Sequence, residues 1–491
     1  MPRAPANTRR QVLFWPEAQR GMTYRIPALL YLPRTHTFLA FAEQRCSVKD
    51  EDAKCLVLRR GWKQGASVKW GPIETLTAAV LPDHRTMNPC PVYEQDSGTV
   101  FLFFICVRQH VTEWHQIHTG RNATRLCNVA SRDGGQTWSP LTDLTEQVIG
   151  EDLKKWATFA VGPGHGVQLS SGRLVIPAYT YYIHTRCCGI PVSCFTTPHS
   201  LIFYSDDRGR KWHKGKLLKG KSTVECEVAE VRDPDRGPVL YCNARTPGKC
   251  RVVAFSRDRG VDFARPSRCT ELREPPHGCQ GSVVSFSPTE EPAAVDGVEG
   301  TGPDVGEKTC LARCGNASST TCHGATSWLV YSHPTSSRRR VNLGIYLNKT
   351  PLETNSWESP WVLYQGPCGY SDLAVCEESP PLFGCLFECG VVCPCEQIAF
   401  QLFTQQELES RGRSSSSEQQ PETKMDVDQT GPYPRQEELP KALHLGATGV
   451  IETTTPALPE SISLSTSGQL SGEPSLRTPH APAGAQPFRP S

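Results

Sequence analysis

Three arginines, far apart in the sequence, are the first residues whose chemistry stands out. Arg25 lies in Tyr24-Arg25-Ile26-Pro27, Arg245 ends Asn243-Ala244-Arg245, and Arg340 ends a short basic run. The side chain of arginine is a planar fork that stays charged and can bind a carboxylate through two parallel hydrogen bonds. If the fold brings these residues together, they would form a clamp for the carboxylate of a substrate.

Acidic residues and a tyrosine supply candidates for an acid, a base and a nucleophile. The candidates lie in Phe41-Ala42-Glu43-Gln44-Arg45, Lys49-Asp50-Glu51-Asp52, Val224-Glu225-Cys226-Glu227 and Gly369-Tyr370-Ser371-Asp372. A carboxylate nucleophile would be repelled by an anionic substrate, whereas a tyrosine that passes its proton to a glutamate would not. The residues therefore suit the cleavage of a bond beside a carboxylate.

The residues alone leave several assignments open. Glu51 and Asp52 compete with Asp50 for the acid, Glu227 and Glu230 compete with Glu225 for the base, and Tyr331 competes with Tyr370 for the nucleophile. The register of Arg338-Arg339-Arg340 could slip by one residue. His165 lies between two glycines and could line a pocket, although a loop histidine with a satisfied hydrogen bond is the simpler interpretation.

The cysteines near the C-terminal end of the ordered pattern raise the question of a zinc site. They are Cys376, Cys385, Cys389, Cys393 and Cys395. Their spacing lacks paired Cys-x-x-Cys arms, so we expect buried thiols and no metal. No nucleotide-binding glycine loop is present, so no cofactor is expected.

The elements that must position these residues are short strands. Segments rich in β-branched and aromatic residues alternate with turn residues, and long helical periods are scarce. The expected strands include Leu29 to Tyr31, Phe38 to Ala42, Phe101 to Val107, Leu174 to Ala178, Leu201 to Tyr204 and Trp328 to Tyr331. One short helix is expected within Asp143 to Gly150.

An internal repeat gives the strongest evidence on the fold. Ser-x-Asp-x-Gly-x-x-aromatic occurs at Ser131 to Trp138, Ser205 to Trp212 and Ser256 to Phe263, each time after an apolar strand. The aspartate can accept turn N–H groups, the glycine can adopt a positive φ, and the aromatic ring can fold back onto the sheet. Three such Asp-boxes predict a bladed β-propeller and carry almost no evidence for catalysis.

The length of the ordered pattern predicts six blades. About 400 residues would fill six four-stranded blades at roughly 65 residues each. We expect an N-terminal extension over 1–19, the propeller over 20–404, a disordered loop inserted at 287–326 and a disordered tail over 405–491, because the loop and tail are too polar to bury a core.

Composition limits the partners and the compartment. The 52 Lys and Arg residues nearly balance the 50 Asp and Glu residues, which argues against binding nucleic acid through bulk charge. The first 20 residues lack the apolar core of a secretory signal, and the longest apolar run, Val100 to Val107, is too short to span a membrane. We therefore expect the 22 cysteines to be mostly reduced.

Together, these motifs resemble those of the animal exo-α-sialidases. Tyr24-Arg25-Ile26-Pro27, the three Asp-boxes, Asn243-Ala244-Arg245 and Gly369-Tyr370-Ser371-Asp372-Leu373 occur in the family's order, and the likeness runs from about Arg20 to Phe403. It is nearest to the vertebrate plasma-membrane ganglioside sialidases. The resemblance implies a six-bladed propeller and a retaining hydrolysis of terminal sialic acids with a tyrosine nucleophile, as is known for sialidases.

The resemblance also implies a role for each candidate residue. Arg25, Arg245 and Arg340 would clamp the substrate carboxylate, Asp50 would be the general acid and then base, and Tyr370 would be the nucleophile, with Glu225 taking its proton. Arg45 would line the pocket, and Glu43 would orient an arginine, with Arg25 the first choice. Asn88, Tyr179, Tyr181 and Gln280 would contact the N-acyl, glycerol or hydroxyl groups of the sugar.

The implied partners are gangliosides, sialylated oligosaccharides and glycoproteins. The implied location is the plasma membrane, through peripheral association, with endosomal or lysosomal membranes as alternatives. Two rival functions stay open at this point. One is a catalytically silent propeller that binds sialoglycans, and the other is a trans-sialidase.

Overall fold

The computed structural model describes residues 10–16, 21–187, 190–192, 195–289, 327–376 and 379–415. Within these residues the protein is almost entirely β-structure, and every strand named in the sequence prediction is present. No helix among the described residues combines the length and the apolar character needed to cross a membrane. Apart from residues 287–289, the expected loop over 287–326 lies outside the described residues, as does most of the expected tail.

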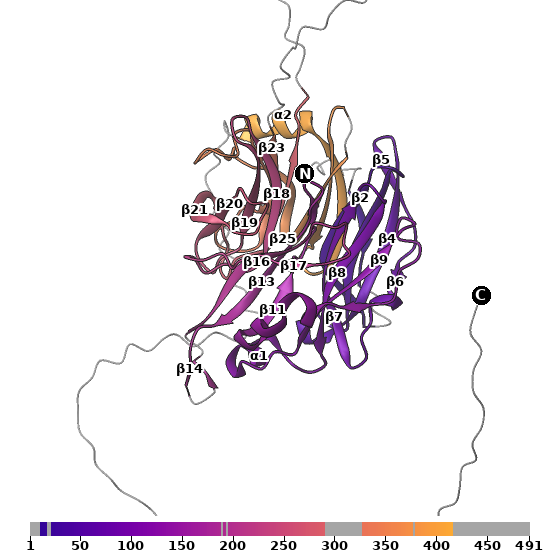
Figure 1. Cartoon of the computed structure of the whole chain (residues 1–491). Helices are drawn as coiled ribbons and strands as arrows, with labels where there is room; N and C mark the ends of the chain where they lie inside the picture. The colour runs from indigo at the N-terminus through magenta and orange to yellow at the C-terminus, as the bar shows by residue number, and fades with distance from the viewer. Residues whose placement is uncertain are drawn as a thin grey trace, which may run out of the picture. The chain divides into compact units, whose positions relative to one another are not determined.

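Four antiparallel sheets follow one another along the chain (Figure 1). The first contains β2 (Thr23–Leu32), β3 (Thr37–Arg45), β4 (Ala53–Gln64), β5 (Ser67–Trp70) and β6 (Glu74–Thr75). The second contains β7 (His84–Glu94), β8 (Thr99–Arg108), β9 (Thr124–Ser131) and β10 (Thr142–Asp143). The third contains β11 (Trp156–Val161), β12 (Val167–Gln168), β13 (Leu174–Ile183), β16 (Thr196–Ser205) and β17 (His213–Lys214). The fourth contains β18 (Cys226–Asp233), β19 (Gly237–Ala244), β20 (Cys250–Ser256) and β21 (Ala264–Arg273).

The rest of the chain forms a seven-stranded sheet and a small hairpin. The sheet contains β22 (Ser282–Phe286), β23 (Trp328–Pro334), β24 (Val341–Asn348), β25 (Trp361–Cys376), β26 (Leu382–Cys389), β27 (Gln397–Thr404) and β1 (Gln11–Phe14). The hairpin pairs β14 (Arg186–Cys187) with β15 (Ile190–Pro191). The long strand β25 pairs with β24 through its first part, up to Pro367, and with β26 from Cys368 onward.

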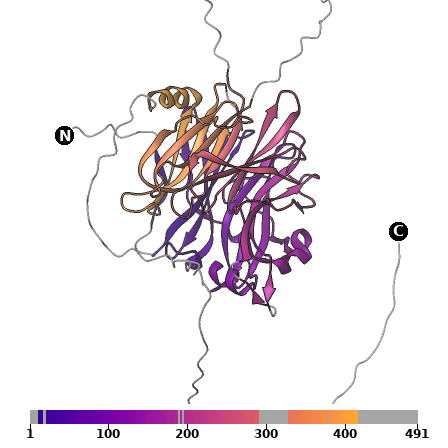
Figure 2. The same ribbon diagram turned by 90° about the vertical axis from the view of Figure 1, so that its left-hand side faces the viewer.

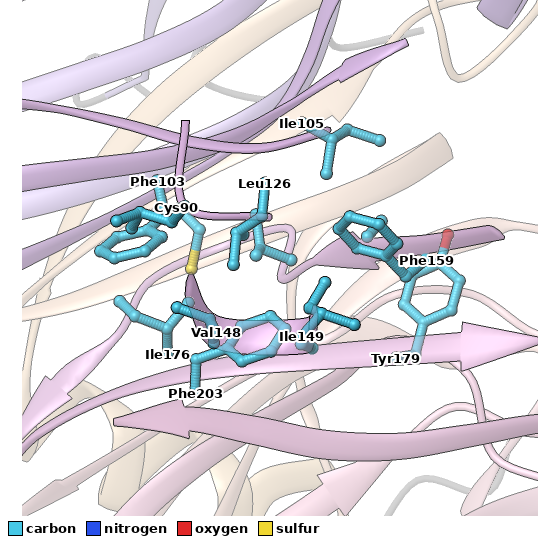
Figure 3. Close-up of a cluster of buried hydrophobic side chains, with 14 of the residues drawn as sticks. Cys90, Phe103, Ile105, Leu126, Val148, Ile149, Phe159, Ile176, Tyr179 and Phe203 are labelled. Carbon is cyan, nitrogen blue, oxygen red and sulfur yellow. The ribbon is translucent and has the colours of Figure 1, made fainter. Parts of the chain in front are cut away.

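Hydrophobic clusters lie between successive sheets and close them into a ring. Figure 3 shows one cluster between the second and third sheets, where Phe103 and Leu126 meet Ile176 and Phe203. Another cluster joins the first sheet to β26 and β27, so the first and last strands of the fold pack together (Figure 2). Sheets that close in this way form a β-propeller, which has no exposed long edge strands.

The Asp-boxes have the turn geometry that the sequence predicts. The backbone N–H groups of Gly135, Gly209 and Gly260 each donate to the serine four residues earlier, at 2.8–2.9 Å. The tryptophans of the first two boxes, Trp138 and Trp212, pack against aromatic rings of the preceding sheet. Trp212, for example, lies 4.5 Å from Phe103 between ring centroids. Each Asp-box therefore joins two neighbouring blades.

The ends of the domain differ from the prediction. β1 lies within the expected N-terminal extension but pairs with β27, so the sheet begins before residue 20. Residues 405–415 form helix α2 (Gln405–Ser415), which the low-complexity interpretation of the tail missed. Leu408 is buried in the cluster of the last strands, and this contact stabilises the helix.

The other helical segments are short. The expected helix at Asp143 to Gly150 is a single π-helical turn, η4 (Thr145–Ile149), followed by the 3₁₀ segment η5 (Gly150–Lys155). Two further 3₁₀ turns are η2 (Asp50–Asp52) and η3 (Thr77–Ala79). Helix α1 (Glu113–Thr119) was not predicted, and Thr112 caps it by accepting the N–H of His115. Figure 1 shows α1 and β14 at one end of the strands and α2 at the other.

Candidate active site

The three arginines of the predicted clamp meet at one end of the ring. Arg25 lies on β2, Arg245 directly follows β19, and Arg340 directly precedes β24. The guanidinium carbons of Arg25 and Arg340 lie 5.5 and 5.6 Å from the centroid of the Tyr370 ring. Arg245 donates from Nη1 to the hydroxyl of Tyr370 at 2.9 Å. The structure thus brings together residues from three different sheets around one tyrosine.

An irregularity in β2 directs Arg25 into the site. The pairing of β2 with β3 shifts register between Arg25 and Ala28, and Ile26 has a φ of 60°. A positive φ is costly for a β-branched residue and persists only where its surroundings enforce it. Here the N–H of Ile26 donates to Glu388, 3.0 Å away, which holds the strained residue in place.

Tyr370 and Glu225 form a direct hydrogen bond. The hydroxyl of Tyr370 donates to Oε1 of Glu225 at 2.6 Å, and Arg245 donates to the other oxygen of Glu225 at 2.7 Å. Burial, and then the charge of Glu225, raise the pKa of Tyr370 well above its ordinary value. The phenol therefore keeps its proton, and the carboxylate of Glu225 accepts the hydrogen bond that it donates.

Asp50 stands at the open side of the site. Its side chain is 61% exposed, and its Oδ1 accepts a hydrogen bond of 2.7 Å from Arg45. Enclosure by protein would raise the pKa of Asp50, but the charges of Arg45 and Arg25 outweigh this effect and lower it. An exposed carboxyl that faces the mouth can reach a leaving group that points out of the site.

Glu43 orients Arg45 and not Arg25, which corrects the expected pairing. Both residues are fully buried on β3, and Oε2 of Glu43 accepts hydrogen bonds from Nε and Nη2 of Arg45. The two side chains are two residues apart on one strand, so they lie on the same face of the sheet. The other oxygen of Glu43 accepts the N–H of Asn88 at 2.7 Å, which ties the first sheet to the second.

The partner of Arg25 is Glu388, which the sequence reasoning missed. Oε1 of Glu388 lies 3.1 Å from Nε of Arg25, and its Oε2 accepts the N–H of Tyr370 at 3.0 Å. Glu388 is fully buried on β26. A carboxylate inside an otherwise apolar strand needs a charged partner. The apolar neighbours of Glu388 in the sequence could therefore have identified it as the partner of a site arginine.

A second group missing from the prediction is Glu113, at the start of α1. Its carboxylate lies 3.5 Å from the hydroxyl of Tyr179. Glu113 is exposed to solvent. Even so, enclosure by protein atoms, and then the nearby charges of Asp50 and Glu225, raise its pKa to about 7. Tyr179 and Tyr181 lie beside one another on β13, with ring centroids 6.3 Å apart. These three side chains form one wall of the site.

Asn88 and Gln280 are buried beneath the site. The amide nitrogen of Asn88 donates to the carbonyl of Val161 at 3.3 Å. The amide nitrogen of Gln280 lies 3.2 Å from the carbonyl of Pro163 and 3.3 Å from Glu227, and its oxygen accepts the N–H of Ser371 at 3.0 Å. In this structure the amide of Gln280 is thus turned toward protein and supports the segment that carries Tyr370.

The competing residues occupy other places. Asp52 accepts a hydrogen bond from Ser47, and Glu230 accepts the N–H of Ser170. Tyr331 is a fully buried core residue. Within the part of the chain that the structure describes, Asp50 is the member of the acidic run that forms ion pairs with the site arginines Arg25 and Arg45.

His165 has the satisfied hydrogen bond that the simpler interpretation expected. Its Nδ1 lies 2.7 Å from Asp372 and 3.7 Å from Glu227, and all three groups are buried. Asp372 also accepts the N–H of Leu29 at 2.6 Å and the hydroxyl of Ser282 at 2.8 Å. Because these oxygens already have donors, the group fits a hydrogen-bonded ion pair better than a set of metal ligands. Of the cysteines considered for zinc, Cys376, Cys385 and Cys389 are buried, whereas Cys393 and Cys395 are only partly buried.

The chain is similar to several known proteins. Residues 36–384 match the family described as a BNR repeat-like domain. The chain is 59% identical over 399 residues to sialidase-3 of Homo sapiens, a match that covers 81% of this chain and 92% of that protein. It is 44% identical over 390 residues to sialidase-2 of Mus musculus, covering 78% and 92%. Among solved structures, a Hadza microbial sialidase has the same fold, with a TM-score of 0.59 at 22% identity over 79% of this chain and 66% of that one.

The fold, the site and these relatives define a glycoside hydrolase. The chain belongs to the sialidase family and is an exo-α-sialidase, an enzyme that removes terminal sialic acids.

Proposed function

We propose that the chain hydrolyses terminal sialic acids with retention of configuration, with Tyr370 as the nucleophile. The observation that carries this proposal is the hydrogen bond of 2.6 Å from Tyr370 to Glu225, inside a ring of three arginines. Arg25, Arg245 and Arg340 would hold the carboxylate of the sugar, and their charge would favour that anion in the site.

The first step breaks the glycosidic bond. The protonated form of Asp50 is the minor form near neutral pH, because the charges of Arg45 and Arg25 lower the pKa of this carboxyl, and it is this form that gives its proton to the leaving oxygen. At the same time the phenolic oxygen of Tyr370 bonds to the anomeric carbon and Glu225 takes the phenolic proton. In the second step, Asp50 takes a proton from water, the water oxygen replaces Tyr370 at the carbon, and Glu225 returns the proton to the phenol. Two displacements at one carbon retain its configuration.

The other predicted residues support this chemistry. Arg45 would position Asp50, and Glu43 would position Arg45. Tyr179, Tyr181 and Asn88 would contact the polar groups of the sugar, while Gln280 would support the segment that carries Tyr370.

Six blades account best for the sheets. The seven-stranded sheet would count as two blades, because β25 pairs with β24 over its first part and with β26 over its second. Clusters between each pair of neighbouring blades, including the last and first, support this count among the described residues.

Gangliosides are the proposed substrates, and peripheral association with the plasma membrane is the proposed location. Support comes from the identity to sialidase-3 and from the sequence motifs shared with membrane-associated ganglioside sialidases. Oligosaccharides and glycoproteins that end in sialic acid would be poorer substrates. Release of sialic acid from mixed ganglioside micelles and from a sialoglycoprotein, at equal sialic acid content, compares the two. Equal rates of release would contradict the proposed preference for gangliosides.

Covalent trapping tests the nucleophile. The enzyme is incubated with 2,3-difluorosialic acid, digested and mapped by mass spectrometry, with Tyr370→Phe as the control. We expect the label on the peptide that contains Tyr370 and no label on the variant. A label on Asp50 or Glu225, or an active Tyr370→Phe enzyme, would contradict the assignment.

A further inference from the structure

The turn between β26 and β27 exposes two adjacent valines. Val391 is 86% exposed and Val392 is 74% exposed, the largest fractions among the exposed large hydrophobic side chains of the described residues. Such exposure is unfavourable in water and marks a surface that contacts another phase or molecule.

This turn satisfies its own backbone donors. The carboxylate of Glu396 accepts the N–H groups of Val391, Val392 and Cys393 at 2.7–2.8 Å. At its base, the carbonyl of Gly390 accepts a hydrogen bond of 2.7 Å from the hydroxyl of Tyr364. An N–H group that enters an apolar phase without a partner costs several kcal/mol. This turn, residues 390–396, is called the valine turn below. Its N–H donors need no water, and its shape is fixed before it contacts any other phase.

The valine turn stands at the mouth of the active site. It follows Glu388 on β26, and the thiol of Cys395 is close enough to Arg25 and Arg340 to interact electrostatically with both. Two more exposed apolar residues lie beside site residues: Val48 precedes Asp50 by two positions, and Trp114 follows Glu113. We call Val48, Trp114, Val391 and Val392 the apolar rim.

Basic side chains accompany the apolar rim. Arg338 and Arg339 are exposed on the turn between β23 and β24, directly before the site residue Arg340. A surface that combines exposed apolar side chains with arginines complements a layer of anionic lipid headgroups over acyl chains.

We propose that the apolar rim rests on an anionic lipid surface, with Val391 and Val392 inserted among the headgroups, so that the mouth of the site faces the membrane. The inference rests on the proposed function in one respect, because a ganglioside presents its sialic acid at such a surface. Contact at the rim concentrates lipid-linked substrate at the site and leaves the cleavage of a free sialoside unaffected.

Vesicle binding by the full chain tests this proposal without any ganglioside. The vesicles contain phosphatidylcholine and phosphatidylserine, and binding is measured by co-sedimentation over a range of lipid concentrations. The test variant is Val391→Ser/Val392→Ser. The matched control is Leu352→Ser/Val362→Ser, which removes two apolar side chains that are 37% and 41% exposed and lie outside the rim.

We expect the wild type and the control to bind, and the test variant to need about tenfold more lipid or more for half-maximal binding. All three should cleave a soluble fluorogenic sialoside equally, which shows that each is folded. The proposal is overturned if the wild type does not bind the vesicles, or if the test variant binds as well as the wild type. A failure to prefer gangliosides would instead contradict the proposed substrate, because these vesicles contain none.

Discussion

Glu388 holds Arg25 through a contact of 3.1 Å between Oε1 and Nε, although the two residues are 363 positions apart in the sequence. The same carboxylate receives the N–H groups of Ile26 and Tyr370. One buried acid thus fixes both a clamp arginine and the proposed nucleophile. In this respect Glu388 is a positioning residue for the site.

Replacement of Glu388 by glutamine should weaken the site. Glutamine has the same shape but lacks the charge, and its amide cannot accept from all three donors. We expect kcat/KM for a fluorogenic sialoside to fall by about 10- to 100-fold, mainly through a higher KM. Glu396→Gln, which changes an acid of the same type in the neighbouring turn, is the control. An unchanged KM in Glu388→Gln would show that Arg25 needs no such partner.

Glu113 should make substrate binding depend on pH near neutrality. Its pKa is about 7, so the carboxyl is mostly neutral at pH 6 and mostly ionised at pH 8. The negative charge formed at high pH would repel the sialic acid carboxylate. We expect the inhibition constant of a non-cleavable sialic acid analogue to rise severalfold between pH 6 and pH 8 in the wild type. In Glu113→Gln the constant should stay flat, and a rise like that of the wild type would rule out this residue as the cause.

His165 should make stability fall at alkaline pH. Burial alone would lower the pKa of His165, but Asp372 and then Glu227 outweigh it and raise the pKa from 6.5 to about 9. A raised histidine pKa gives stability that is complete below about pH 6.5 and is lost as pH rises through about 9. The free energy of unfolding falls by on the order of 3 kcal/mol over this pH range. Tm should therefore fall between pH 6.5 and pH 9.5, and His165→Gln should have a lower Tm that changes less over this range. His213→Gln, an exposed histidine on β17, should follow the wild type; a His165→Gln curve parallel to the wild type would contradict the assignment.

Gly209 of the second Asp-box and Gly172, in a turn outside the Asp-boxes, offer a matched pair of stability variants. Gly209 and Gly172 have φ angles of 83° and 85°, but a Cβ at Gly209 would lie 2.3 Å from the ring of Phe101, whereas one at Gly172 would contact nothing within 4 Å. Gly172→Ala should cost about 1 kcal/mol through its backbone alone. Gly209→Ala should cost several kcal/mol in chemical denaturation, because the blades must also separate. Equal costs would show that the contact between blades is easily relaxed.

The repeat made the fold predictable from the sequence. Each Asp-box places a serine, an aspartate and a glycine at fixed spacing, and these residues hydrogen-bond within one turn. Local chemistry of this kind can be read without knowing the rest of the structure. The direction in which Trp212 packs, onto the preceding blade, depends on a neighbouring sheet and could not be inferred in the same way.

Much of the site was also predictable, but the partners of its arginines were not. From the residues alone, Asp50, Glu225 and Tyr370 each had competitors, and the resemblance of the runs that contain them to sialidase motifs selected them. Glu388 has no such run, and its role comes from a contact across the ring. Glu43 was paired with Arg25, its neighbour across β2 and β3, whereas the side chain of Arg45 on its own strand lies closer.

The pairing of β1 with β27 also affects how the protein folds. Gln11 aligns with Phe400, so the last sheet is complete only when the two ends of the described domain meet. Contacts of such high sequence separation are slow to form, because a very long loop must close before they bring any gain. We expect β1 to join the sheet late in folding. Until the rest of the ring has formed, a newly made chain would lack the complete last sheet. Glu388, which lies on that sheet, would not yet be held in its final position.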